Sequence, residues 1–163
     1  MTIAASAGTV RPAVATDIPA LARIWFEGWH KAHYDTLPAE LRQYRTEVSF
    51  AGRLQSLLED VRALVRDGEP SGFVILRGNE LYQFYVALEQ IGTGAAGVLM
   101  ADAEAELRAR GHGTAILNCA EGNHRAARFY EKSGWRNTGV AEIEVDAGGR
   151  PFALKALRFE KAL

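Results

Sequence analysis

The chain has 163 residues, of which 48% are apolar and 24% charged, and its formal net charge is −1. This composition is typical of a globular protein with one sizeable core, so we expect a single domain over residues 1–163, with residues 1–8 as a flexible tail. The balanced charge provides no overall basic field, and neither a nucleic acid nor a membrane is an expected partner. Cys119 is the only cysteine, which excludes an internal disulfide and a cysteine-rich zinc cluster.

The N-terminal residues, Met1 to Thr9, lack the charged start and long apolar run of a secretory signal. No segment approaches the roughly 20 uninterrupted apolar residues that cross a bilayer. We therefore expect a cytoplasmic protein.

The first third of the chain is predicted to hold one strand and two helices. A short strand is expected at Thr9–Val14, followed by a helix from Ile18 to Lys31 in which apolar residues recur at helical spacing. Thr16 and Asp17 offer side-chain oxygens that could cap this helix. A second helix is expected from Ser49 to Glu59.

Three short strands follow, because the apolar pattern changes its period. They are expected at Val61–Arg66, Gly72–Arg77 and Glu80–Ala87. The turn residues Asp67-Gly68 and Gly78-Asn79 separate them, a pattern that is typical of antiparallel hairpins.

The last third of the chain alternates helices and strands. We expect a helix at Ala95–Arg110, a strand at Thr114–Cys119, a short helix at Asn123–Lys132, and a final hairpin of Trp135–Val145 with Pro151–Lys161. A strand, a helix and a strand in succession imply a parallel pair joined by a right-handed crossover. With antiparallel hairpins on either side, the sequence predicts an α/β fold with a mixed sheet.

The glycine-rich turn Ile91-Gly-Thr-Gly-Ala-Ala-Gly97 lies between a predicted strand and a predicted helix. A helix start presents unpaired N–H groups and the positive end of the helix dipole, so such a turn can bind a phosphate or pyrophosphate. Glycines chosen only for the geometry of the turn would give the same pattern. A Walker loop does not fit, because Val98-Leu99 stands where Lys and Ser or Thr are needed. A dinucleotide fingerprint fits poorly, since hairpins precede the turn and the next strand ends in Asn118-Cys119.

Two segments of the chain carry a family resemblance. The first is Gly78-Asn-Glu-Leu-Tyr-Gln-Phe-Tyr-Val86 followed by Ile91-Gly-Thr-Gly-Ala-Ala96, and the second is Glu121-Gly-Asn-His-Arg-Ala-Ala-Arg-Phe-Tyr-Glu-Lys-Ser-Gly-Trp135. In order and spacing they resemble the motifs Gln/Arg-x-x-Gly-x-Gly/Ala and Asn-x-x-Ala-x-x-Phe-Tyr-x-Lys-x-Gly-Phe of the GNAT superfamily of N-acetyltransferases. The resemblance covers nearly the whole chain.

The resemblance implies a central mixed, mostly antiparallel sheet, flanked by helices, with a splayed parallel strand pair formed by Leu81–Val86 and Thr114–Cys119. The pantetheine arm of acetyl-coenzyme A would lie between these strands, and the pyrophosphate would lie against the glycine turn. The resemblance is also compatible with a homodimer. The cofactor-binding residues that the resemblance implies are Tyr85, Val86, Ile91, Gly92, Thr93, Gly94, Ala95, Ala96, Gly97, Asn123 and Tyr130.

The activity that the resemblance implies is direct transfer of an acetyl group to a primary amine of a small molecule or peptide. Tyr130 would protonate the departing thiolate, since a phenol stays protonated near neutrality and can donate a hydrogen bond as charge develops. Alternatively, Tyr130 has only a structural role and packs the short helix against the sheet. Glu80 would remove the amine proton through water, although a solvated residue in the turn would look the same. Other candidate bases are Glu27, His30 and His33.

The acceptor is expected to contact the first helical region, where Trp29, His33 and Tyr34 are the candidate substrate-binding residues. Alternatively, the tryptophans of this region belong to the core and its histidines are exposed to solvent, without a role in binding. No third ligand accompanies the histidine pair, so no metal is expected. Cys119 lies on an apolar strand, which favours a structural thiol over a nucleophile.

Ile91 departs from the family motif, which has Arg or Gln at this position, while Gln90 lies one residue earlier. Backbone N–H groups hold phosphates at such turns, so the departure does not by itself remove binding. It leaves open a catalytically weak or inactive coenzyme-A-binding regulatory module.

Overall fold

The computed structural model describes residues 8–163, so the expected tail at residues 1–8 lies outside the described residues except for Gly8. Its principal elements are β1 (Thr9–Pro12), α1 (Ile18–His33), α2 (Glu47–Ser56), β2 (Val61–Arg66), β3 (Glu69–Arg77), β4 (Glu80–Val86), α3 (Ala95–Ala109), β5 (Thr114–Ala120), α4 (His124–Lys132), β6 (Arg136–Ala147) and β7 (Arg150–Ala162). Short 3-10 helices include η2 (Ala39–Tyr44) and η4 (Leu88–Gln90).

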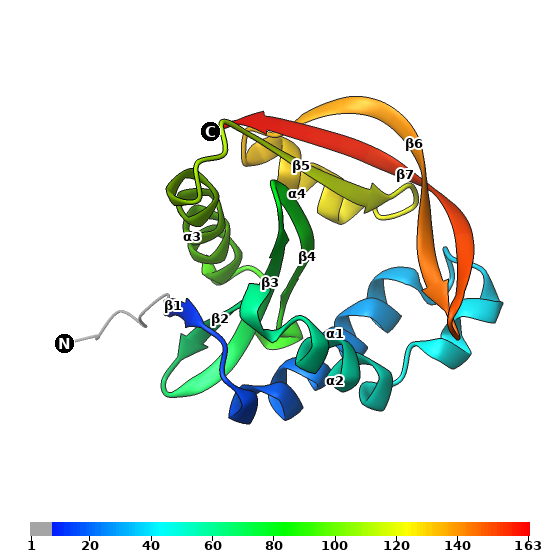
Figure 1. Ribbon diagram of the computed structural model, residues 1–163, viewed down its shortest axis with the longest axis horizontal. Coiled ribbons are helices and arrows are strands. Elements are labelled where there is room, and N and C mark those ends of the chain that lie inside the picture. The colour runs from blue at the N-terminus through cyan, green and yellow to red at the C-terminus, as the bar shows by residue number, and fades with distance from the viewer. Residues whose placement is uncertain (1–7) are drawn as a thin grey trace.

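The described strands form one seven-stranded sheet in the order β1-β2-β3-β4-β5-β7-β6 (Figure 1). Every neighbouring pair is antiparallel except β4 and β5, which are parallel. The predicted α/β fold with a mixed, mostly antiparallel sheet is therefore confirmed.

The parallel strands β4 and β5 are joined at one end only. Glu80 is opposite Ile116, the Ile116 N–H donates to the Asn79 carbonyl at 3.1 Å, and the Asn79 side chain donates to the Thr114 carbonyl at 3.0 Å. β5 pairs with β7 along its whole length, so its far end follows β7 away from β4 (Figure 1). The facing edges of β4 and β5 are left without a strand partner there, as the predicted splay requires.

The helices cover both faces of the sheet and form two apolar cores. α1 and α2 pack on one face, where Trp25 stacks on Phe50 with ring centroids 4.5 Å apart. α3 and α4 pack on the other face, around Leu99 and Phe159. Each such fully buried side chain contributes about 1.5–3 kcal/mol through burial alone, so both faces stabilise the sheet.

Helix α2 begins at Glu47, two residues before the predicted start at Ser49. Thr46 and Ser49 form a capping box, in which the Ser49 N–H donates to Thr46 Oγ1 at 3.1 Å and the Thr46 N–H donates to Ser49 Oγ at 3.0 Å. Ser49 is therefore the third residue of the helix and not its first. The helix ends at Ser56 instead of Glu59.

The expected capping of α1 by Asp17 is also wrong. The Asp17 carboxylate accepts hydrogen bonds from the Arg11 guanidinium at 2.7 and 3.0 Å and from the Val14 N–H at 2.9 Å, and it makes no bond to the first turn of α1. The guanidinium of Arg11 holds the pKa of this carboxyl below its ordinary value. Asp17 thus ties the end of β1 to the start of the helical region.

The hairpin of β6 and β7 extends beyond its pairing with β5 and reaches the α1 and α2 side of the molecule (Figure 1). Val145, Phe152 and Leu154 from the hairpin pack against the core around Trp25. Gly148 at its tip has a left-handed φ of +67°, and a Cβ atom there would overlap the ring of Tyr44 in η2. The hairpin therefore closes over one side of the splayed strands.

Candidate active site

Two cavities adjoin where β4 and β5 separate. The first, called here the hairpin cavity, has a volume of about 620 Å³ and is bounded by α1, α2, β4, β5 and the β6–β7 hairpin. The second, the turn cavity, has a volume of about 530 Å³ and lies beside the glycine turn and the start of α4. The residues that line both are Phe84, Tyr85, Asn123, Ala126 and Tyr130.

The glycine turn opens directly onto free space. Gly92 and Gly94 have left-handed φ values of +81° and +88°, and apart from the glycine itself and its two chain neighbours no described residue has an atom within 4 Å of a Cβ built on either. The first N–H groups of α3 have no partner within the helix, and they carry its positive dipole end. Ala95 N–H contacts Thr93 Oγ1 at 3.4 Å, whereas Ala96 lines the cavity. The arrangement fits a bound anionic group.

Basic side chains accompany the turn. Lys31, His124 and Arg125 line the turn cavity, and no acidic residue of residues 8–163 does. None of the three was predicted as a site residue. Arg125 lies two residues after Asn123, so its position at the start of α4 was the one signal available in the sequence.

Ile91 lines the turn cavity, and Gln90 does not. The Gln90 side-chain carbonyl accepts a hydrogen bond from the Arg66 guanidinium, and the Gln90 backbone carbonyl accepts one from the Thr93 hydroxyl at 2.6 Å. Gln90 therefore holds the turn in shape from outside the cavity.

The predicted cofactor-binding residues divide into two groups. Those that line the turn cavity are Tyr85, Val86, Ile91, Gly92, Ala96, Asn123 and Tyr130. Those that do not are Thr93, Gly94, Ala95 and Gly97. Ala95 is fully buried, and the other three are exposed around the first turn of α3.

Asn123 caps α4. Its Oδ1 accepts a hydrogen bond from the Ala126 N–H at 3.2 Å, and its carbonyl accepts one from the Ala127 N–H at 3.1 Å. The side-chain amide nitrogen is left as the group that can contact a ligand in either cavity.

Tyr130 is 8% exposed and packs against the rings of Phe84, Phe129 and Phe159. No group in residues 8–163 makes a hydrogen bond to its hydroxyl. Burial raises the pKa of this phenol well above its ordinary value, so the hydroxyl stays protonated and can act as a donor.

Trp29 and His33 both line the hairpin cavity, with their rings edge to face and 5.6 Å apart. His33 is buried, and its Nδ1 has no hydrogen-bond partner in the described part of the chain. Burial lowers the pKa of His33 to about 4, which keeps the ring neutral at physiological pH. Tyr34 lies outside both cavities, is 48% exposed, and packs against the Arg42 guanidinium.

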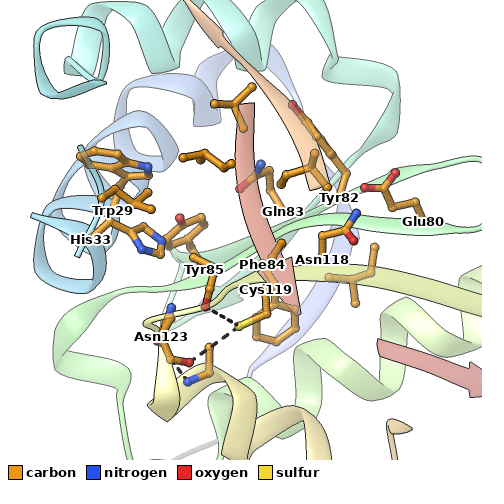
Figure 2. Close-up of a pocket in the computed structure, with 18 of the residues that line it drawn as sticks. Trp29, His33, Glu80, Tyr82, Gln83, Phe84, Tyr85, Asn118, Cys119 and Asn123 are labelled. Atoms are coloured by element: carbon orange, nitrogen blue, oxygen red, sulfur yellow. Dashed lines mark hydrogen bonds between the residues drawn. The ribbon is translucent and has the colours of Figure 1, made fainter. Parts of the chain in front are cut away.

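Glu80 lines the hairpin cavity, on the side away from His33 and Asn123 (Figure 2). Of the other candidate bases, Glu27 pairs with Arg23 at 3.0 Å and lines neither cavity. His30 also lies outside, with its Nε2 2.8 Å from the Arg45 carbonyl. His33 alone among them shares the cavity with Glu80. Glu144, which was not predicted, lines it too.

Cys119 is part of the hairpin cavity wall. Its thiol donates to the carbonyls of Ala120 and Asn123, both at 3.7 Å. Burial raises the pKa of this thiol to about 11, so it stays protonated and is a poor nucleophile.

Arg45 and Arg53 also line the hairpin cavity, and neither was predicted. Arg53 donates to the Tyr82 hydroxyl at 2.7 Å, and its guanidinium lies over the Trp25 ring at 4.6 Å. It follows Phe50 by three residues and therefore shares the buried face of α2, a signal that the sequence contained. Arg45 lies between η2 and α2, where no periodic pattern indicates burial.

Within residues 8–163, no three His, Cys, Asp or Glu side chains are grouped so that they could hold a metal ion. No helix in that part of the chain is long and apolar enough to span a membrane.

Comparisons with known proteins agree with this geometry. The sequence profile of the Acetyltransferase (GNAT) domain matches residues 32–148. A search of curated protein sequences finds no significant match.

Solved structures share the fold. A GCN5-related N-acetyltransferase from Rhodopseudomonas palustris is 22% identical over 100% of both chains, with a TM-score of 0.76. A ribosomal-protein-alanine N-acetyltransferase from Brucella melitensis is 22% identical over 94% of this chain and 99% of its own, with a TM-score of 0.71. The PaiA N-acetyltransferase from Thermoplasma acidophilum, solved in complex with coenzyme A, is 20% identical over 94% of this chain and 98% of its own, with a TM-score of 0.65.

The family profile covers well over half of the chain, and it includes both the glycine turn and the start of α4. The solved acetyltransferases share the overall fold of the chain. The chain therefore belongs to the GNAT acetyltransferase family and is an acyltransferase.

Proposed function

We propose that the protein transfers an acetyl group from acetyl-coenzyme A directly to a primary amine. The observation that carries this proposal is the meeting of two cavities at Asn123 and Tyr130. Such an arrangement lets two substrates approach from separate sides and react at a shared wall, which supplies the orientation that a bimolecular transfer needs.

The turn cavity has the groups that coenzyme A requires. The first N–H groups of α3, together with Lys31 and Arg125, suit the phosphates. The edge of β4 at Tyr85 and Val86 has no strand partner on the β5 side, so its backbone can pair with the pantetheine amides. The bound cofactor supplies an activated acetyl thioester.

Tyr130 acts as the proton donor to the departing sulfur. Tyr130 lines both cavities, and its hydroxyl is protonated and has no hydrogen-bond partner among the described residues. A donor held in place before the reaction stabilises the negative charge that develops on the sulfur.

Glu80 acts as the base for the amine. An alkylammonium must lose a proton before it can attack, and Glu80 is a carboxylate of the hairpin cavity at the far side from Asn123 (Figure 2). That position requires the proton to pass through water.

Transfer is direct, without an acetylated enzyme. Cys119 is the only cysteine of the chain and lines the hairpin cavity, and its thiol stays protonated and bonded to backbone carbonyls. A nucleophilic cysteine needs a lowered pKa, which is the opposite of what burial produces here.

The proposal is tested by following free thiol while acetyl-coenzyme A is mixed with a broad panel of primary amines. We expect thiol release that depends on protein and on amine, together with an equal amount of N-acetyl product. Binding of coenzyme A with no release for any amine would instead favour a coenzyme-A-binding regulatory module.

A further inference from the structure

Two guanidinium groups face the hairpin cavity without a neutralising carboxylate. Arg45 is 6% exposed and Arg53 is partly buried, and no carboxylate of residues 8–163 lies within ion-pair distance of either. Two partly buried arginines elsewhere in the described residues are paired with carboxylates. Arg62 and Arg11, which are less buried than Arg45, are paired with Asp102 and Asp17 at 2.7 Å.

The surroundings of the two arginines add further donors, and the carboxylate that acts on Arg45, Asp146, lies beyond ion-pair distance. Arg53 bonds to the Tyr82 hydroxyl, which keeps its own hydrogen to donate. The Tyr82 and Tyr85 side chains leave β4 on the α1 and α2 side, as their packing in that core shows (Figure 2). Burial and the charge of Arg53 both lower the pKa of Arg45, while Asp146, Tyr82 and Tyr85 act in the opposite direction. Two positive charges buried near each other destabilise the folded protein unless an anion neutralises them.

The side chains around the whole hairpin cavity also carry an excess of positive charge. The cationic lining residues are Arg45, Arg53, Arg77 and Lys155, and the anionic ones are Glu80 and Glu144. His33 is neutral at physiological pH. Such a cavity attracts an anionic or zwitterionic molecule and disfavours a polycation.

The phosphates of the cofactor do not account for these arginines. Arg45 and Arg53 line only the hairpin cavity, whereas Lys31 and Arg125 line only the turn cavity beside the start of α3. The two sets of cations therefore serve different ligands.

We propose that the acceptor is a small amine that carries a carboxylate, as an amino acid does, with the carboxylate bound between Arg45 and Arg53 and the amine directed to the junction at Tyr130. This inference rests on the acetyl transfer proposed above. A guanidinium fork matches a carboxylate in shape and charge, and Trp25 and Trp29 provide an apolar wall for a side chain. A cavity of about 620 Å³ has room for a molecule of this size.

The test compares matched acceptors in the thiol-release assay. Each of a set of amino acids is paired with its own amide, which keeps the amine and removes the negative charge, and spermidine represents polycations. We expect kcat/KM to be roughly 10- to 100-fold higher for the carboxylates, as befits a charge-assisted pair of hydrogen bonds. Equal or better use of the amides or of spermidine would overturn the inference and leave the acetyl transfer intact.

Variants then locate the binding group. Arg45→Gln and Arg53→Gln should each raise KM for the carboxylate acceptor about tenfold and reduce the preference over the amide, with KM for acetyl-coenzyme A unchanged. Arg45→Lys keeps the positive charge but lacks the forked guanidinium. Its KM for the carboxylate acceptor should therefore lie between that of wild-type protein and that of Arg45→Gln. Arg108→Gln, on the exposed side of α3, is the control. Unchanged acceptor KM and unchanged preference in both Gln variants would contradict the assignment.

A binding measurement separates this inference from the acetyl transfer itself. With coenzyme A at saturation, so that the turn cavity is filled, wild-type protein is heated with an N-acetyl amino acid or with its neutral amide. We expect the carboxylate alone to raise Tm, and Arg45→Gln to lose that rise. If no amine is a substrate but the carboxylate-specific rise persists, the anion site stands and the transfer proposal fails. Absence of the rise in wild-type protein overturns the anion site.

Discussion

The ring of Tyr130 lies edge-on to the ring of Phe84, with centroids 6.4 Å apart and an interplanar angle of 79°. Phe84 belongs to β4 and Tyr130 to α4, so the contact joins elements on the two sides of the opening between β4 and β5. Both rings line both cavities. The packing fixes the ring of Tyr130 beside both cavities, and no described residue makes a hydrogen bond to its hydroxyl.

Tyr130→Phe removes the hydroxyl and keeps this packing. We expect kcat to fall by roughly 100-fold, within the range for a general acid, with little change in KM for acetyl-coenzyme A or in stability. Steady-state kinetics and a melting curve measure both. Tyr34→Phe, outside both cavities, should behave as wild type, and wild-type kcat in Tyr130→Phe would disprove the role.

Glu80→Gln should change the pH dependence of the rate. Without the carboxylate, the amine must lose its proton to solvent, so the loss should be largest near neutrality and should shrink as pH approaches the pKa of the amine. The measurement is kcat/KM for one amine across roughly pH 6–10, a range that spans the titration of common amines. A loss of the same factor at every pH would mean that Glu80 serves structure or binding instead.

Cys119→Ala should retain most of the activity. The Cys119 thiol is protonated and bonded to backbone carbonyls, so its removal costs packing in the cavity wall rather than a catalytic step. Rapid-quench kinetics should show no burst of thiol release without an amine. A burst that disappears in Cys119→Ala would establish an acetylated cysteine and contradict direct transfer.

His33 should make the protein less stable in acid. Its pKa is about 4 in the folded protein, against 6.5 for a histidine exposed to water, so between these values the unfolded chain binds more protons. The free energy of unfolding therefore falls as pH drops from 6.5 to about 4, by up to about 3 kcal/mol from this one group. Urea unfolding at several pH values measures the slope, which His33→Gln should reduce and the control His112→Gln should not. An unchanged slope in His33→Gln would show that the ring is not held neutral by burial.

The fold was largely predictable because its turns are marked by residues with few alternatives. Gly78-Asn79 and the glycines from Gly92 to Gly94 stand where the chain reverses or enters a helix. Where two local interactions compete, the sequence was less informative. Ser49 looked like a helix start, but it completes the capping box of Thr46 from inside the helix.

The cofactor side of the site was more predictable than the acceptor side. Asn123 and Tyr130 lie in a local motif, and because Asn123 caps α4 and Tyr130 lies within it, both reach the junction. Arg45 lies between η2 and α2 and is buried near the Trp29 ring and Asp146 of the distant hairpin, and no local pattern indicates such burial. Tyr34 shares a region with Trp29 and His33, but it follows the last turn of α1 and points outward.

The central claim is that two substrates meet at the junction of the two cavities and exchange an acetyl group. The most direct measurement is mass spectrometry of the acceptor, with parallel thiol detection, after wild-type or Tyr130→Phe protein is mixed with acetyl-coenzyme A and the matched amines. We predict one N-acetyl product per thiol released with wild-type protein, and a roughly 100-fold slower reaction with the variant. Saturable binding of coenzyme A without any acetylated amine would contradict it.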